Sequence, residues 1–94
     1  MGSESQNVFY RVPTIECPVC GQGYIAAWKS PRHPSVGLIC TECESEWICA
    51  TERLAQPSLK EEDIVAGPRD PHGRMATLEE LYKENIARRF ITTV

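Results

Sequence analysis

The 94-residue sequence has no long apolar run and no block of basic residues. A membrane-spanning helix needs about 18 or more consecutive apolar residues, and no stretch here approaches that length. The first six residues have neither the positive charge nor the apolar core of a signal peptide, so we expect a cytoplasmic protein. A net charge of −3 without a basic cluster argues against a dedicated nucleic-acid binder, whose affinity depends on neutralising phosphates.

Patterns that would indicate catalysis are missing as well. The sequence contains no paired carboxylates, no nucleophile motif and no phosphate-binding loop. Glu42, Glu44 and Glu46 alternate along the chain, which is more typical of a solvated rim than of catalytic carboxylates. A catalytic zinc ion keeps one coordination position open and usually has His or carboxylate among its ligands. We therefore predict that the protein is not an enzyme.

Five cysteines are the most informative residues that are present. Cys17 and Cys20 form one Cys-x-x-Cys pair, Cys40 and Cys43 form another, and 19 residues separate the pairs. This spacing is typical of zinc sites, in which four thiolates surround one ion at about 2.3 Å. An odd cysteine count without a secretion signal fits thiolate ligands in a reducing compartment better than disulfides. We predict one structural Zn²⁺ on these four residues; two disulfides or idle core cysteines are the alternative.

The segment between the two pairs predicts a β-hairpin. Pro18 and Gly21 favour a tight turn at the first pair, because proline presets φ and glycine accepts a positive φ. Short strands are expected over residues 24–28 and 36–40. The turn-rich stretch 30–35 between them should form an exposed tip. The hairpin would carry the second pair back to the first.

Two further strands are expected around this hairpin. Residues 44–50 read as a third strand, in which Trp47 and Cys49 share one face, so Cys49 should be a buried thiol. Residues 8–12 are β-branched and aromatic and end at a proline, which predicts a strand at one edge of the sheet.

Two capping signals predict helices in the second half of the chain. Ser58 and Glu61 form an S-x-x-E box, which predicts a short helix over residues 59–66 that stops at Gly67 and Pro68. The second box, Thr77 and Glu80, opens a longer helix.

The longer helix is predicted from an apolar stripe with helical spacing. Its members are Leu78, Leu81, Tyr82, Ile86 and Phe90. Glu79–Lys83 and Glu84–Arg88 would form ion pairs on the opposite side. We expect the stripe to pack on the sheet, within a helical segment over residues 58–92; an alternative is that it binds a partner.

The cysteine turns and the aromatic residue that follows them resemble the zinc ribbon family over residues 15–50. The matching features are Cys-Pro-Val-Cys-Gly at 17–21, the hairpin, Cys-Thr-Glu-Cys at 40–43 and Trp47. The resemblance implies that Trp47 packs beneath the site and that the metal ligands are Cys17, Cys20, Cys40 and Cys43. The second turn lacks the usual glycine after its last cysteine, which implies a looser turn and weakens a similarity to rubredoxins.

These observations predict an α+β protein: a small zinc-ribbon antiparallel sheet with a short helix and a C-terminal amphipathic helix. Residues 8–94 would form one domain, preceded by a disordered tail over residues 1–7.

Because the sequence shows no pattern for catalysis, we expect the protein to act by binding. The acidic, mixed-charge chain favours a protein partner, and its net charge favours a basic one. In general appearance the chain resembles small bacterial regulatory proteins and the acidic immunity proteins that neutralise toxin domains. Tyr24 and Trp28 are candidate anchors for such a partner.

Two other functions stay open. Trp28, Lys29, Arg32 and His33 would form a basic and aromatic hairpin tip, which a nucleic-acid-binding or transcription-associated ribbon could use. A rubredoxin-like electron carrier would hold iron in the same four cysteines. Otherwise His33 and His72 are expected to be exposed and inert.

Overall fold

The computed structural model describes residues 9–13, 15–65 and 70–93, so the predicted tail over 1–7 lies outside the described residues. These ranges contain a six-stranded antiparallel sheet and two short α-helices. The strands are β1 (Phe9–Arg11), β2 (Ile25–Lys29), β3 (Gly37–Cys40), β4 (Glu46–Trp47), β5 (Arg74–Met75) and β6 (Ile91–Thr93). The helices are α1 (Ala50–Leu54) and α2 (Leu78–Lys83), with 3₁₀ turns η2 (Glu61–Asp63) and η3 (Ala87–Arg89).

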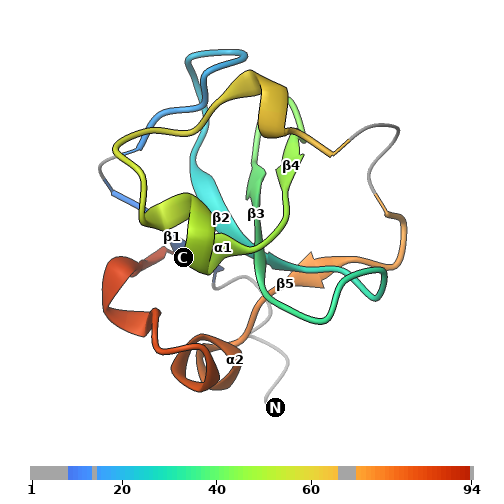
Figure 1. The fold of residues 1–94 in the computed structure, drawn as a ribbon, viewed down its shortest axis with the longest axis vertical. Helices are drawn as coiled ribbons and strands as arrows, with labels where there is room; N and C mark the ends of the chain where they lie inside the picture. The colour runs from blue at the N-terminus through green and yellow to red at the C-terminus, as the bar shows by residue number, and fades with distance from the viewer. Residues whose placement is uncertain (1–8, 14, 66–69, 94) are drawn as a thin grey trace.

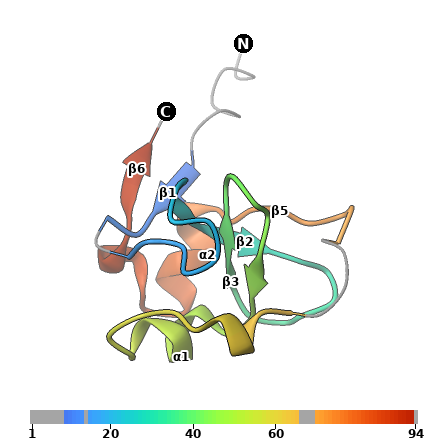
Figure 2. The same cartoon turned by 90° about the horizontal axis from the view of Figure 1, so that it is seen from above.

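The sheet is built outward from the predicted hairpin. Its strand order is β4-β3-β2-β1-β6, and β5 pairs with the end of β2 (Figures 1 and 2). In the hairpin, Ile25 lies opposite Cys40 and Trp28 lies opposite Gly37. The strands predicted over 24–28 and 36–40 are therefore confirmed to within one residue. The edge strand predicted over 8–12 is present as β1, but it lies inside the sheet because β6 covers its outer side.

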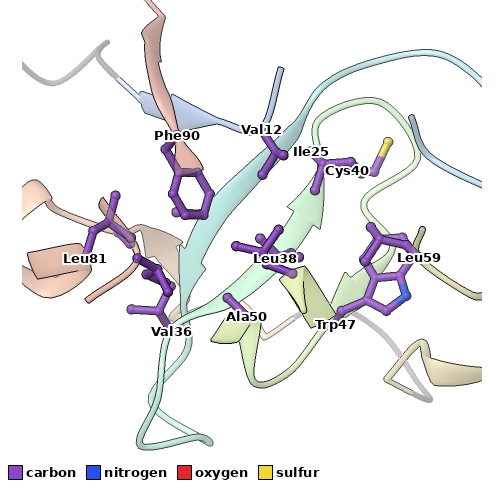
Figure 3. Close-up of a cluster of buried hydrophobic side chains, with 14 of the residues drawn as sticks. Val12, Ile25, Val36, Leu38, Cys40, Trp47, Ala50, Leu59, Leu81 and Phe90 are labelled. Atoms are coloured by element: carbon purple, nitrogen blue, oxygen red, sulfur yellow. The ribbon is translucent and has the colours of Figure 1, made fainter. Parts of the chain in front are cut away.

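One face of the sheet carries the main hydrophobic core. Ile25, Leu38 and Trp47 are fully buried there, and the Trp47 indole donates a hydrogen bond of 2.9 Å to the Lys60 carbonyl. Figure 3 shows Leu81 and Phe90 of the C-terminal segment pointing toward this cluster. Burial of each large apolar side chain stabilises the fold by roughly 1.5–3 kcal/mol.

The predicted length of the C-terminal helix is wrong. The Thr77–Glu80 capping box is present, but α2 ends after six residues, and Asn85 has a positive φ of 61°. The chain then forms η3 and β6, so the predicted i,i+4 geometry of Glu84 with Arg88 does not exist. The Glu84 carboxylate instead accepts a hydrogen bond of 2.8 Å from the Val36 N–H.

The apolar stripe therefore divides between core and solvent. Leu81, Ile86 and Phe90 are buried, whereas Leu78 is 40% exposed and Tyr82 is 68% exposed. A stripe lies on one face only while the helix continues, and the turn at Asn85 changes the direction of the chain. Ile86 and Phe90 reach the core from outside the helix.

The helix predicted over 59–66 is also wrong. Only the 3₁₀ turn η2 forms; its N-cap is Lys60 without a side-chain cap, so the Ser58–Glu61 box is not used. Tertiary hydrogen bonds hold the segment instead, from the Trp47 indole to the Lys60 carbonyl and from the Val65 N–H to the Glu46 carbonyl. The predicted stop at Gly67 and Pro68 lies outside the described residues.

The third strand is much shorter than predicted. β4 ends at Trp47, Cys49 adopts a left-handed conformation with φ 58°, and the unpredicted helix α1 begins at Ala50. The Ala50 N–H donates to the Val36 carbonyl at 2.7 Å, and Ala50 and Leu54 are buried on the core. Cys49 is thus half-buried beside α1, and the prediction of a buried thiol on a strand is wrong.

In the hairpin tip over 30–35, Pro31, Arg32 and Pro34 are exposed as predicted, but Ser30 is buried and anchors the tip at its base. The Asp70 carboxylate accepts hydrogen bonds from the Ser30 hydroxyl (2.7 Å) and the His72 N–H (2.9 Å), and the Arg32 guanidinium lies 3.4 Å away. These three contacts hold the pKa of Asp70 below its usual value, with the His72 N–H contributing most. His72 is exposed as predicted, whereas His33 is half-buried.

Trp28 does not form part of an exposed tip. It is only 4% exposed, because β5 pairs alongside it and Gly73 lies against its ring. A Cβ at Gly73 would overlap the indole, so a residue without a side chain is required there. The prediction that Trp28 presents a binding surface is therefore wrong.

Candidate metal centre

The four predicted ligand residues come together at one end of the β2–β3 hairpin. Cys17 and Cys20 lie in the turn before β2, Cys40 is the last residue of β3, and Cys43 lies in the turn after it. All four Sγ atoms lie within 4.8 Å of one another. The Sγ atoms of Cys17 and Cys43 are 3.6 Å apart, as are those of Cys20 and Cys40. Figure 3 shows the sulfur of Cys40 at the border of the core.

This arrangement fits a tetrahedral ion rather than disulfides. Zn–S bonds of about 2.3 Å in a regular tetrahedron place sulfur atoms about 3.8 Å apart, close to the observed separations. A disulfide would need about 2.05 Å, and all five cysteines, each of which is described, are free. Four thiolates are a donor set that suits zinc or iron. The geometry of the four cysteines is therefore consistent with the predicted zinc-ribbon-like metal site.

The two cysteine turns have the same hydrogen-bond pattern. The Val19 N–H donates to Cys17 Sγ and the Glu42 N–H donates to Cys40 Sγ, each at 3.4 Å. The turns are closed by the Gly21 N–H to the Cys17 carbonyl and by the Glu44 N–H to the Cys40 carbonyl, each at 3.0 Å. Hydrogen bonds to sulfur favour the thiolate, which is the form that binds metal.

The second turn is not looser than the first, contrary to the prediction from its missing glycine. Gly21 has φ 68° and Glu44, at the matching position, has φ 62°. Glycine adopts this left-handed region at little cost, whereas a residue with a Cβ is strained there. The sequence departure therefore changes the energy of the turn and leaves its shape intact.

The thiols at the centre differ in acidity. Burial raises the pKa of Cys17, and it raises the pKa of Cys40 to about 12. For Cys43, slight burial raises the pKa, but hydrogen bonds from the Ser45 hydroxyl and N–H outweigh this and lower it to about 7. A bound cation would favour all four thiolates, so metal binding must release protons.

Ser45 is a site residue that the sequence reasoning missed. Its hydroxyl lies 3.2 Å from Cys43 Sγ, the most exposed of the four sulfur ligands. Its only signal in the sequence is its place two residues after Cys43. Trp47 belongs to the same buried cluster as Cys17 and Cys40, as the resemblance implied. Cys49 is not part of the four-sulfur group.

Comparisons with family models, with curated proteins and with solved structures found no match. Within the described part of the chain, neither α-helix has the length and apolar character that crossing a bilayer requires. The geometry of the four cysteines is therefore the main evidence about function.

Proposed function

We propose that the protein is a structural-zinc protein that acts by binding a protein partner, as a small regulator or a toxin-neutralising immunity protein. The observation that supports the structural-zinc part of the proposal is the convergence of Cys17, Cys20, Cys40 and Cys43 within 4.8 Å. Four thiolates fill a tetrahedral shell, which leaves no position for a substrate. The four cysteines that would hold the ion would therefore have a structural role, and we propose no enzymatic role.

A metal in this position would join the ends of the hairpin. The first turn precedes β2 and the second follows β3, so one ion links segments 20 or more residues apart in the sequence. Structural zinc supplies on the order of 10 kcal/mol of apparent folding free energy in small domains. A 94-residue chain with a small core gains much from such a link.

The surface favours a protein over a nucleic acid as the partner. At the hairpin tip, Arg32 lies against Asp70 and the Lys29 ammonium donates to the His33 carbonyl at 2.8 Å, while Trp28 is buried. No aromatic ring of the tip is therefore available for stacking on bases. With zinc on four thiolates the net charge would be about −5, which would steer a basic partner toward the protein.

The identity and stoichiometry of the metal are tested by elemental analysis of protein that has not been exposed to a chelator. We expect one zinc ion per chain. Cys43→Ser should lose the ion and unfold, while the matched variant Cys49→Ser should keep both metal and fold, at a cost below about 1 kcal/mol, because Cys49 is half-buried and outside the cluster. Loss of metal in Cys49→Ser would overturn the ligand set. A red, iron-loaded preparation would favour the electron carrier.

The partner is tested by native pull-down with zinc-loaded protein, followed by mass spectrometry, with unfolded Cys43→Ser as the control bait. We expect a specific protein that the control does not capture. Labelled single- and double-stranded oligonucleotides at physiological salt should show no binding by fluorescence anisotropy. Sub-micromolar oligonucleotide binding that Lys29→Glu and Arg32→Glu abolish would replace the proposal with the nucleic-acid alternative.

A further inference from the structure

We propose that the outer edge of β6 binds an extended acidic segment of the partner by adding it to the sheet as a further strand. This inference rests on the proposed function only in taking the partner to be a protein. Three observations support the inference: the pairing of β6, the exposed side chain of Ile91, and the positive charges of Arg88 and Arg89 before the strand.

The outer edge of β6 is an open hydrogen-bonding surface. Among the described residues β6 pairs with β1 alone, and Figure 2 shows it as the outermost strand on its side of the sheet. About half of the N–H and C=O groups of an edge strand point away from its neighbour. Such an edge is a template for another strand.

The opposite edge of the sheet is protected, whereas no residue in the described ranges covers the outer edge of β6 with a further strand. β4 has only two residues, and the Val65 N–H donates to the Glu46 carbonyl at 2.8 Å along its outer side. β6 reads Ile-Thr-Thr, which is β-branched and lacks the lysine, proline or inward charge that usually guards an edge.

One exposed apolar side chain, Ile91, lies on β6 itself, and an aromatic surface lies further into the sheet, across β1. The register places Ile91 opposite Arg11, and the Arg11 guanidinium lies 4.3 Å from the centre of the Tyr24 ring. The Phe9 and Tyr24 rings are 6.4 Å apart. Ile91 is 41% exposed and Tyr24 is 46% exposed. Alternate side chains of an added strand would lie beside Ile91 on this face of the sheet, which gives a means of selecting among segments.

The charge at the start of β6 defines the chemistry of the segment. Arg88 and Arg89 lie three and two residues before the strand, which begins after Phe90; both are exposed and form no ion pair with any residue that the structure describes. The net charge, about −5 with zinc on four thiolates, acts on the approach of the whole partner, whereas a contact closer than the screening length of about 8 Å depends on the charges beside it. At the contact itself, the exposed guanidinium groups of Arg88 and Arg89 favour carboxylates.

A second copy of the chain fits this edge less well than a partner segment. Stable dimers bury about 800 Å² on each subunit, and a three-residue strand cannot supply this area between two rigid bodies. An extended segment can follow the three-residue edge and place a side chain against the exposed Ile91 without needing a second large surface.

The test uses zinc-loaded, ¹⁵N-labelled protein and synthetic ten-residue peptides of alternating Glu and Val. We expect saturable amide shifts at residues 88–93 below about 1 mM peptide. A Lys-Val peptide should bind at least about fivefold more weakly. A Glu-Val peptide N-methylated at alternate residues, which lacks the edge-facing N–H groups, should not bind.

Protein variants give the matching control. Arg88→Glu with Arg89→Glu should weaken Glu-Val binding by about fivefold or more, whereas Lys83→Glu in α2, which also removes an exposed cation, should leave it unchanged. Shifts confined to other residues, equal binding of the Lys-Val or N-methylated peptide, or no binding would overturn the proposal. Concentration-dependent shifts at 91–93 without peptide would assign the edge to a second copy instead.

Failure of this inference can be told apart from failure of the proposed function. A dispersed spectrum with one zinc ion per chain and a captured partner, but no shifts at 88–93, removes only the docking site. An undispersed spectrum or absent metal removes the structural-zinc proposal itself.

Discussion

Glu44 stands where the matching cysteine turn has Gly21, and both residues hold a left-handed backbone. The turn closes through the same hydrogen bond in each case, so the side chain does not alter its shape. For a residue with a Cβ this conformation costs about 1 kcal/mol or more. The second turn therefore stores strain next to the last two candidate ligands.

Replacing Glu44 with glycine should stabilise the protein. We expect Glu44→Gly to raise the free energy of unfolding by about 0.5–1 kcal/mol, because relief of the left-handed strain exceeds the extra entropy of glycine in the unfolded chain. Denaturant unfolding of zinc-loaded protein measures it. Glu44→Ala is the matched control: it removes the same carboxylate but keeps a Cβ, so it should bring no gain. Equal stability of the two variants would show that backbone strain is not the cause.

At the scale of elements, α2 illustrates a local signal that starts a helix without setting its length. Thr77 Oγ1 accepts from the Glu80 N–H at 3.2 Å, and Glu80 accepts from the Thr77 N–H at 2.9 Å. The Arg74 guanidinium also binds Glu80 through two bonds of 2.9 and 2.7 Å. Arg74, followed by the cap, lowers the pKa of Glu80 to about 2.

The low pKa of Glu80 predicts how acid acts on the protein. A carboxylate with a depressed folded-state pKa contributes stability above its ordinary value of about 4.5, and this contribution is lost as the pH falls toward 2. Glu80→Gln should lack it, at a cost of about 1–2 kcal/mol near neutral pH, a reduced figure because Arg74 is half-exposed. The acid-unfolding midpoint of Glu80→Gln, followed by circular dichroism, should therefore lie at higher pH than that of the wild type.

Glu79→Gln provides the comparison for this experiment. Glu79 lies in the same helical turn as Glu80, and its replacement by Gln removes the same charge. Glu79 is exposed, however, and takes no part in the cap. Its midpoint should match the wild type. If both variants shift alike, the effect comes from the helix charge in general and not from the Arg74–Glu80–Thr77 contacts.

At the scale of the whole molecule, the C-terminal segment belongs to the core of the sheet. Leu81, Ile86 and Phe90 are buried in the cluster that also contains Val12, Leu38 and Trp47. Figure 3 shows Phe90 near Leu81 on one side of this cluster. Glu84 ties the same segment to β3 through the Val36 N–H. The hairpin and the C-terminal segment should therefore unfold together.

Substitutions at Phe90 and Tyr82 distinguish the observed packing of the C-terminal segment from that of a continuous helix. Phe90→Ala should lower the free energy of unfolding by about 3 kcal/mol, because it opens a cavity in the shared core. Tyr82→Ala should change it by less than about 0.5 kcal/mol, since Tyr82 is 68% exposed. Denaturant unfolding of the two variants measures both values. Comparable losses in the free energy of unfolding would contradict the observed packing and favour the single helical stripe that the spacing predicted.

The features that the sequence alone determined are those that depend on short-range geometry. The Cys-x-x-Cys spacing brings two sulfur atoms into one turn, and the hairpin returns the second pair to the first, so the candidate ligands Cys17, Cys20, Cys40 and Cys43 were identified. The Thr77–Glu80 cap was identified for the same reason, since its two hydrogen bonds join residues three apart.

Tertiary structure decided where elements end and which side chains are buried. Trp28 is buried by β5 and Gly73, more than 40 residues away in the chain, and Lys60 and Val65 bond to Trp47 and Glu46 instead of continuing a helix. Asn85 turns the chain so that Phe90 enters the core and β6 pairs with β1. Helical spacing and capping energies of about 1 kcal/mol are local preferences. Burial of apolar side chains and pairing of strands outweigh them, and both depend on partners distant in sequence.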